Sequence, residues 1–316
     1  MKNQFTIKHS FVLLTVFTVL LLTLMMPSIA QSANTNAKLK PFVLAQTIQS
    51  TDINKVISDS KTKLTNNGFE VIGEYAPYSN VHILIVTNNA LKKQASLSEN
   101  GAYGAIQRVT ITANNNLIQV AFTNPTYMSH AYRFKTDLND ITLSLKNSLG
   151  FEKNYGSDEG LSKDDLREYQ YKWLMPNFTD RLELAEYSSQ QEALNAVTNA
   201  LSKNDGGVSK LFQVDIEGKN ETIIGVSMKG NDNSECSSDA YIMSQIDFKK
   251  IKSSGHLPYE ILIKNGNVYA LFAEFRIAIN FPDLSMMGDN SFMSIMCAPE
   301  SIREALTMGS GGSLED

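Results

Sequence analysis

Two long segments of the sequence resemble each other, and this repetition limits the folds that the chain can adopt. Residues 101–128 (GAYGAIQRVTITANNNLIQVAFTNPTYM) are echoed by residues 255–286 (GHLPYEILIKNGNVYALFAEFRIAINFPDLSM). Each begins with Gly, alternates apolar and polar residues, turns at an Asn-rich tip, and ends on Asn and Pro followed by Met. The similarity extends upstream, where residues 44–71 match residues 184–211. A period above about 100 residues is too long for a solenoid unit and predicts duplication of a whole domain.

The first 30 residues have the features of a secretory signal peptide. Lys2 and Lys8 supply a positive start, and residues 11–26 form an uncharged apolar run. Pro27–Ala30 then provides the small residues of a cleavage site. An uncleaved anchor is the alternative, but this run is shorter than the roughly 20 residues that span a bilayer. We therefore expect cleavage near Ala30 and a periplasmic or secreted protein without a stable membrane anchor.

Charge and cysteine content restrict the partners and the redox state of the mature chain. Loss of Lys2 and Lys8 changes the formal net charge from −5 to −7. A mildly acidic chain lacks the clustered basic residues that nucleic acids or anionic lipids require, so we expect neither as a partner. Cys236 and Cys297 form an even pair in an exported chain, which favours a disulfide. Two buried thiols, or a pair too distant to bridge, are the alternatives.

Hydrophobic periodicity and turn residues predict an α+β fold made of two tandem copies of a small antiparallel-sheet domain with helices packed on it. We expect a first copy over residues 38–151, a linker over 152–179, a second copy over 180–309 and a flexible tail over 310–316. In the first copy, the pattern predicts strands at 41–49, 69–75, 81–87, 108–113, 117–122 and 131–134. Helices are expected after Thr51, from Asn88 to Leu97 and over 137–149.

The second copy is expected to repeat this order. Its predicted helices cover residues 190–201 and 299–306, and its predicted strands cover 209–216, 222–228, 259–263, 268–279 and 292–296. The Asn265-Gly266 pair favours a tight hairpin turn. An insert over residues 229–254 carries Cys236 and is expected to replace a short helix. In the linker, residues 169–176 (YQYKWLMP) are aromatic and should pack on another part of the chain.

The first copy resembles the bacterial domain of unknown function 302. The resemblance covers Phe42 to Met128 and rests on NNGFEVIGEY, HILIVTNNALKKQA and QRVTITANNNLIQVAFTNPTYM. It implies an antiparallel sheet with packed helices, members that pair through their sheets, and no established activity. The second copy has Gly206-Gly207-Val208 in place of Gly-Phe, so its assignment rests on the internal repeat. Tandem copies would then form an intrachain pseudo-dimer.

Catalytic motifs are scarce in this sequence. The mature chain keeps three histidines, and none has another His or a Cys at metal-ligand spacing; they are His82, His130 and His256. His130 follows the Asn124-Pro125 bend and is the most plausible acid-base or ligand residue of the three. Glu74 and Glu274 are candidates for general acid-base work if they are buried. However, Arg276 shares a predicted strand face with Glu274, which favours a structural ion pair.

Sulfur is concentrated near the C-terminus, where Met286, Met287, Met293, Met296 and Cys297 lie within twelve residues. Thioether and thiolate ligands suit Cu(I), so copper is an alternative cofactor. In a strand, however, these side chains point to opposite faces and do not converge. Core packing is therefore the favoured interpretation, and we expect no cofactor.

These observations favour an exported binding or accessory protein without catalysis of its own. We expect a ligand or partner cleft where the two copies meet, formed by the Asn-Pro-Tyr-Met and Asn-Phe-Pro-Asp-Leu segments. Trp173 is a further candidate for its apolar lining. The candidate ligand-binding residues are Asn124, Tyr127, His130, Tyr132, Asn280, Phe281 and Asp283. A soft-metal or redox accessory protein is the second hypothesis, and a hydrolase or isomerase is the third.

Overall fold

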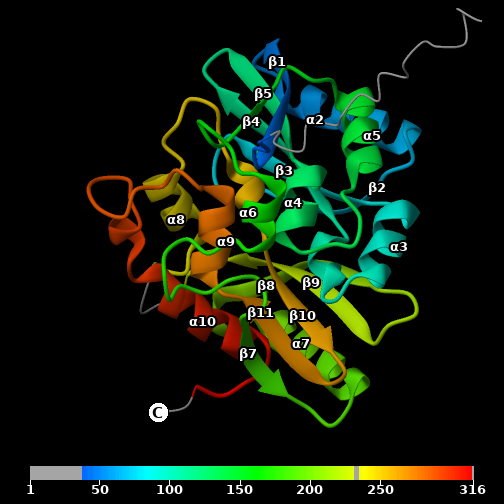
Figure 1. The fold of residues 1–316 in the computed structure, drawn as a ribbon, viewed down its shortest axis with the longest axis vertical. Helices are drawn as coiled ribbons and strands as arrows, with labels where there is room; N and C mark the ends of the chain where they lie inside the picture. The colour runs from blue at the N-terminus through cyan, green and yellow to red at the C-terminus, as the bar shows by residue number, and fades with distance from the viewer. Residues whose placement is uncertain (1–37, 231–234, 315–316) are drawn as a thin grey trace, which may run out of the picture. The chain divides into compact units, whose positions relative to one another are not determined.

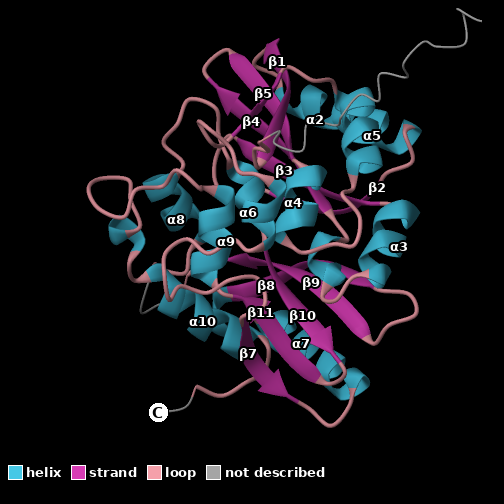
Figure 2. Ribbon diagram, viewed as in Figure 1, coloured by secondary structure: helices cyan, strands magenta, loops and turns pink. Residues whose placement is uncertain are grey.

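Two antiparallel β-sheets, one from each copy, form the framework of the protein (Figure 1, Figure 2). The computed structural model describes residues 38–230 and 235–314. From Lys38 onward these residues form one compact unit. The predicted signal peptide lies outside the described residues.

The first copy, together with strand β6 of the segment that follows it, forms a six-stranded sheet with the strand order β2-β3-β4-β5-β1-β6. Its strands are β1 (Phe42–Gln49), β2 (Glu70–Tyr75), β3 (Val81–Thr87), β4 (Gln107–Asn114), β5 (Leu117–Thr123) and β6 (Lys153–Tyr155). Its helices are α2 (Ile53–Asn66), α3 (Asn89–Leu97), the 3₁₀ turn η1 (Gly101–Gly104), α4 (Pro125–Ala131) and α5 (Asn139–Leu149). Helices α2 and α5 pack together and contact this sheet.

The second copy forms a five-stranded sheet with the order β8-β9-β10-β11-β7. Its strands are β7 (Arg181–Glu186), β8 (Val208–Asp215), β9 (Glu221–Met228), β10 (Tyr259–Lys264) and β11 (Asn267–Leu271). Its helices are α7 (Gln190–Lys203), η2 (Asp205–Gly207), α8 (Asp239–Ile246), η3 (Ser254–His256), α9 (Ala273–Asn280), η4 (Met293–Ile295) and α10 (Ala298–Gly309). Helices α7 and α10 pack together and contact this sheet.

The two sheets have the same topology, which confirms the predicted α+β duplication. Strands β2, β3, β4, β5 and β1 follow the same spatial order as β8, β9, β10, β11 and β7. Equivalent helices also begin in the same way: Asp52 accepts a hydrogen bond from the Lys55 amide before α2, and Ser189 accepts one from the Glu192 amide before α7. The local sequence therefore starts these two helices in the same way.

The copies contact each other reciprocally. Turn η1 of the first copy contacts β9 and β10, and turn η3 of the second copy contacts β3, β4 and β5. The equivalent edge strands β2 and β8 also meet, and a Cβ added at Gly73 would lie 3.0 Å from the Leu211 carbonyl oxygen. One continuous hydrophobic cluster includes buried residues from both copies.

Three predicted strands are wrong in whole or in part. Ala131 ends helix α4 and residues 132–134 lie in the turn after it. The predicted strand at 268–279 is correct only as far as Leu271, because residues 273–280 form α9, and residues 293–295 form η4. Helix α4 begins at Pro125, because the Asn124 side chain accepts a hydrogen bond from the Thr126 amide. Almost every residue of α9 is buried, and a helix buried on all sides has no polar face to distinguish it from a strand.

The predicted equivalence of the Asn-Pro bends is also wrong. Asn114 pairs with Leu117 and Lys264 with Asn267, so both hairpins have two-residue turns that fix the alignment of the copies. In this alignment α4 corresponds to α9. Asn124 precedes α4, whereas Asn280 is the last residue of α9. The shared Asn and Pro therefore lie at opposite ends of equivalent helices.

Regular structure is present in the segment that joins the two copies, and also in the insert of the second copy. Strand β6 pairs with β1, and helix α6 (Lys163–Arg167) begins with a capping box formed by Ser162 and Asp165. The insert contains helix α8, which occupies the place of α3 in the element order. The insert therefore lengthens this connection but keeps its helix.

Candidate functional site

The first-copy residues of the predicted cleft are buried in structural contacts. Asn124 caps α4, and its Nδ2 donates to the Lys40 carbonyl oxygen over 2.9 Å. The Tyr127 hydroxyl donates to the Ile279 carbonyl oxygen over 2.8 Å, which joins α4 to α9. The Tyr132 ring packs on Phe178 with a centroid distance of 5.4 Å. These contacts bring the two predicted segments together but leave Tyr127 and Tyr132 almost inaccessible.

The second-copy residues of the predicted cleft have similar structural roles. Asn280 donates to the Arg276 carbonyl oxygen over 2.8 Å, and Phe281 packs edge-on against the His256 ring. Asp283 accepts hydrogen bonds from the Ser157 hydroxyl and the Asp158 amide. The cavity that Phe281 and Asp283 line has a volume of about 30 Å³. That volume suits about one water molecule rather than a ligand.

Two of the three histidines, His130 and His256, are buried side chains with lowered pKa values. Among the described residues, neither ring nitrogen of His130 has a hydrogen-bond partner. Burial lowers the pKa of His130, and nearby Lys163 and Arg167 lower it further. Burial lowers the pKa of His256 well below its usual value, and the adjacent Arg276 and Arg108 add to this effect. Both rings are therefore neutral near pH 7.

Glu74 does not fit the expected role of a buried acid. It pairs with Lys61 and lies 2.8 Å from His82 Nε2. Partial burial raises the pKa of Glu74, but hydrogen bonds from Lys61 and His82 outweigh burial and lower it overall. Glu74 is therefore ionised at neutral pH, which is the opposite of what a general acid needs.

The predicted ion pair between Glu274 and Arg276 is wrong, because both residues lie on helix α9 rather than on a strand. Residues two positions apart on a helix do not face each other. Arg276 instead pairs with Glu260, which also pairs with Arg108 of the first copy. Arg276 Nη2 further donates to the carbonyl oxygens of His256 at 2.6 Å and Pro258 at 2.8 Å. This buried cluster holds the copies together.

An open groove lies in the second copy, away from the predicted cleft. It has a volume of about 400 Å³ and lies along the start of α9, the first turns of α10, η4 and β7. We call it the methionine-lined groove because four methionines contribute to its wall. Its lining residues are Met175, Leu182, Phe272, Ala273, Glu274, Met286, Phe292, Met293, Ile295, Met296, Pro299, Glu300, Ile302 and Arg303.

Three of the four methionines of this groove are exposed, so the predicted core packing of Met293 and Met296 is wrong. Met293 is 54% exposed and Met296 is 72% exposed. The reason is that this segment forms the 3₁₀ turn η4 instead of a strand. Phe292 and Ile295 are the buried anchors of the turn. The methionines are thereby presented to solvent, where their flexible thioether side chains can adapt to an apolar ligand.

The groove contains one carboxylate without an opposite charge. Glu300 and Arg303 both line the groove, and they pair with each other through a 2.9 Å hydrogen bond. Glu274 lies in the first turn of α9 and also lines the groove. Among the described residues, Glu274 has no ion-pair or hydrogen-bond partner. The groove is therefore apolar with one uncompensated negative charge.

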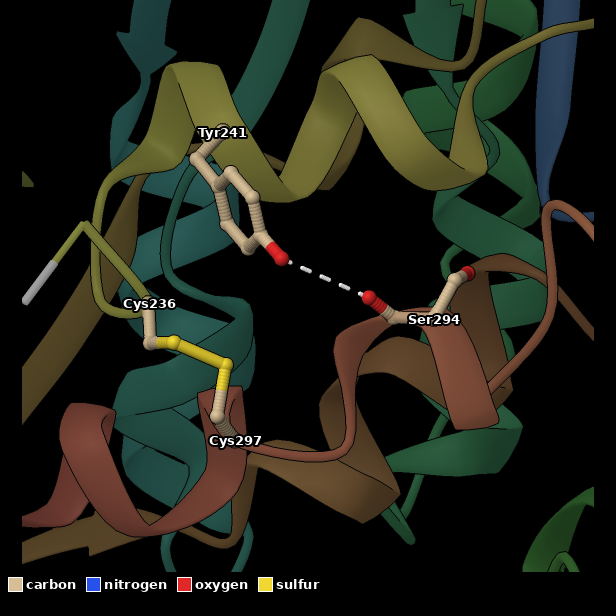
Figure 3. Close-up of a disulfide and its surroundings, with 4 residues drawn as sticks. All are labelled: Cys236, Tyr241, Ser294 and Cys297. Carbon is tan, nitrogen blue, oxygen red and sulfur yellow. Dashed lines mark hydrogen bonds between the residues drawn. A yellow bond between two sulfur atoms is a disulfide. The ribbon is translucent and has the colours of Figure 1, made fainter.

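A disulfide between Cys236 and Cys297 fixes one wall of the groove (Figure 3). Cys297 directly precedes α10, and Cys236 lies in the insert just before α8. The Tyr241 hydroxyl on α8 donates to the Ser294 carbonyl oxygen of η4 over 3.5 Å. The insert thus holds η4 and the start of α10 in place. Cys297 offers no thiolate to a metal in this oxidised form.

A loop beside the groove carries the most exposed aromatic side chain of the structure. Residues 171–176 form this loop, which is closed by the bridge between Gln170 and Asn177. The Tyr171 hydroxyl donates to the Leu284 carbonyl oxygen, as the predicted packing of this segment requires. Trp173 and Leu174 do not pack, since they are 84% and 76% exposed.

Comparison with known proteins adds no further information about this site. No protein-family model, curated protein or solved structure matches the chain. The resemblance of residues 42–128 to the domain of unknown function 302 therefore stays a prediction. In residues 38–230 and 235–314, no helix has the length and apolar character to cross a bilayer. The same residues contain no group of three or more His, Cys, Asp or Glu that fits a metal ion.

Proposed function

We propose that this protein is an exported, non-catalytic binding protein, and that its methionine-lined groove takes an apolar ligand bearing a positive charge. The observation that supports this proposal is the apolar groove with the unpaired carboxylate of Glu274. Its volume of about 400 Å³ falls in the usual range for small-ligand sites. Methionine side chains adapt to ligands of different shapes, so the groove is suited to binding rather than catalysis.

Export is part of the same proposal. The signal-peptide features of residues 1–30 and the disulfide agree with a periplasmic or secreted location, where disulfides persist. The reciprocal contacts of η1 and η3 further support the interpretation of the two copies as an intrachain pseudo-dimer.

Isothermal titration with a matched pair of probes tests the proposal. The cationic 1-naphthylmethylamine should bind more tightly than the anionic 1-naphthylacetate, because only the cation compensates Glu274. Glu274→Gln should remove this preference. Met293→Gln should weaken both probes about tenfold through loss of apolar contact.

Met287→Gln is the control, since Met287 is 73% exposed but does not line the groove. It should leave the binding of both probes unchanged. Equal affinities for the two probes in the wild type, together with no effect of Met293→Gln, would contradict the proposal.

A soft-metal function is the second candidate. The thioethers of Met175, Met286, Met293 and Met296 line one groove, and Cu(I) is the ion that such ligands select. This ligand set differs from the predicted one, because Cys297 is in the disulfide. A Cu(I)-induced rise in melting temperature that Met296→Ala abolishes would favour this function over the first.

A further inference from the structure

Trp173 and Leu174 have no packing partner among the described residues, although the loop that carries them is well anchored. We propose that two copies of this protein associate about a two-fold axis, and that the loop tip of each copy binds in the methionine-lined groove of the other. The tip consists of Lys172, Trp173 and Leu174. This inference rests on the proposed function, because it identifies an occupant for the same groove.

The loop is held in shape before any partner binds. Its ends pair through Gln170 and Asn177, and the Gln170 side chain donates to the Met175 carbonyl oxygen over 2.5 Å. On one side, the Tyr169 hydroxyl donates to the Ala278 carbonyl oxygen, and the Tyr171 ring stacks on Phe292 at 4.7 Å. A rigid tip loses little conformational freedom on association, which favours binding.

The tip and the groove are complementary in chemistry. An indole ring is a large apolar group with few rotamers, and sulfur–aromatic contacts with methionine stabilise its insertion. Buried Trp side chains are also the commonest energetic anchors of interfaces. Next to Trp173, Lys172 supplies a positive charge. Glu274 is the groove carboxylate without an opposite charge, so Lys172 of one copy can compensate Glu274 of the other.

The position of the loop fits a symmetric dimer rather than an open chain of molecules. Met175 belongs to the loop and also lines the groove, so the tip and the groove lie next to each other. A two-fold interface uses the same surface patch on both partners. Adjacent donor and acceptor surfaces allow both insertions to occur in one closed two-fold interface.

Intrinsic fluorescence and sedimentation velocity test this inference directly. Trp173 is the one tryptophan of the sequence, so its emission reports on the tip alone. On raising the protein concentration, the emission should shift to shorter wavelength over the range in which the sedimentation coefficient increases from monomer to dimer. Trp173→Ser should raise the dimer dissociation constant about 30-fold or more.

A charge exchange provides the sharper test. Lys172→Glu and Glu274→Lys should each weaken association, whereas the double variant should restore it. Phe151→Ser is the matched control, because it removes a half-exposed aromatic residue of the first copy and should have no effect. Added 1-naphthylmethylamine should dissociate the dimer by competing for the groove.

Two results would overturn the inference. One is a monomer with unchanged Trp173 emission at all concentrations. If such a monomer still binds 1-naphthylmethylamine in the Met293-dependent manner described above, the proposed function holds and only the dimer is excluded. The other is a dimer that Trp173→Ser disrupts but Met293→Gln and Glu274→Lys do not affect, which would place the tip in a different site.

Discussion

The two copies share a topology but differ at the surface formed by the last two helices and the first strand. In the first copy, α4 packs closely on α5, and the buried hydroxyls of Thr126 and Thr142 lie 2.7 Å apart. Strand β6 also pairs with the outer edge of β1. In the second copy, the equivalent elements α9, α10 and β7 line the methionine-lined groove, and β7 is an edge strand.

The two surfaces are also held in place by different contacts. The closed surface of the first copy lets Tyr127 on α4 contact the Ile279 backbone on α9 across the boundary between the copies. The open surface of the second copy is restrained instead by the disulfide at the start of α10. The methionine-lined groove, which we propose as the binding site, therefore belongs to the second copy.

The largest expected effect concerns the buried charges that join the closed copy to the open one. Glu260→Gln removes the carboxylate shared by Arg108 and Arg276 and leaves two buried cations without a counter-charge. We expect the free energy of unfolding to fall by about 3–5 kcal/mol in a single transition, as measured by urea denaturation.

Glu300→Gln is the matched control, because the Glu300–Arg303 pair is on the surface. It should change the stability by less than about 1 kcal/mol. A Glu260→Gln variant as stable as this control, or one that unfolds in two separate steps, would show that the copies are not one cooperative unit.

The second prediction concerns the pH dependence of the contact between the copies. Asp239 at the start of α8 accepts hydrogen bonds from the Tyr75 hydroxyl of the first copy and the Met228 amide. Burial raises the pKa of Asp239 to about 7, although both hydrogen bonds oppose this effect. The folded state therefore favours the protonated acid, so its stabilisation is complete below about pH 4 and is lost as the pH rises through 7.

We expect the unfolding free energy of the wild type to fall between pH 5 and pH 8 by on the order of 2 kcal/mol more than that of Asp239→Asn. Asp247, whose pKa burial raises to about 6, contributes in the same direction in both proteins. The comparison of slopes therefore isolates Asp239. Parallel stability curves for the two proteins would rule out a raised pKa at this position.

The smallest expected effect is that of replacing an exposed methionine, and it is compared with the effect of replacing a buried one. Met296→Ala in the metal-free protein should change the unfolding free energy by less than about 0.5 kcal/mol, because this side chain is already in solvent. Met128→Ala in α4 should cost about 2–5 kcal/mol, because Met128 is buried and its loss leaves a cavity. Equal costs for the two substitutions, measured by the same denaturation, would mean that the groove is closed in solution.

The sequence was sufficient for features that depend on local or repeated signals. The Asn265-Gly266 turn, the cap at Asn88 and the first five strands of the first copy all follow from residues close in the chain, whereas strand β7 was not predicted. The same local reasoning failed for α9. A buried helix needs partners from elsewhere, and Arg276 finds its own at Glu260 in a cluster that includes Arg108 of the other copy. No short-range pattern encodes that pairing.

In the candidate site, too, some features follow from local sequence and others depend on distant parts of the chain. The concentration of methionines near residue 290 is visible in the sequence, and so is the aromatic segment that contains Trp173. It was not predictable that the two segments lie at the same groove, because Met175 reaches the groove from the segment between the copies. The exposure of Met293 and Met296 depends on the η4 turn, in which Phe292 and Ile295, three positions apart, are buried together.

The placement of the disulfide has a consequence for how the protein is made. Both cysteines belong to the second copy, and the first copy contains none. The first copy therefore needs no oxidant of its own, whereas the groove wall is tethered only after Cys297 has emerged and been oxidised. Protein produced in a reducing cytoplasm would have an untethered groove wall, so ligand screens require material from an oxidising host compartment.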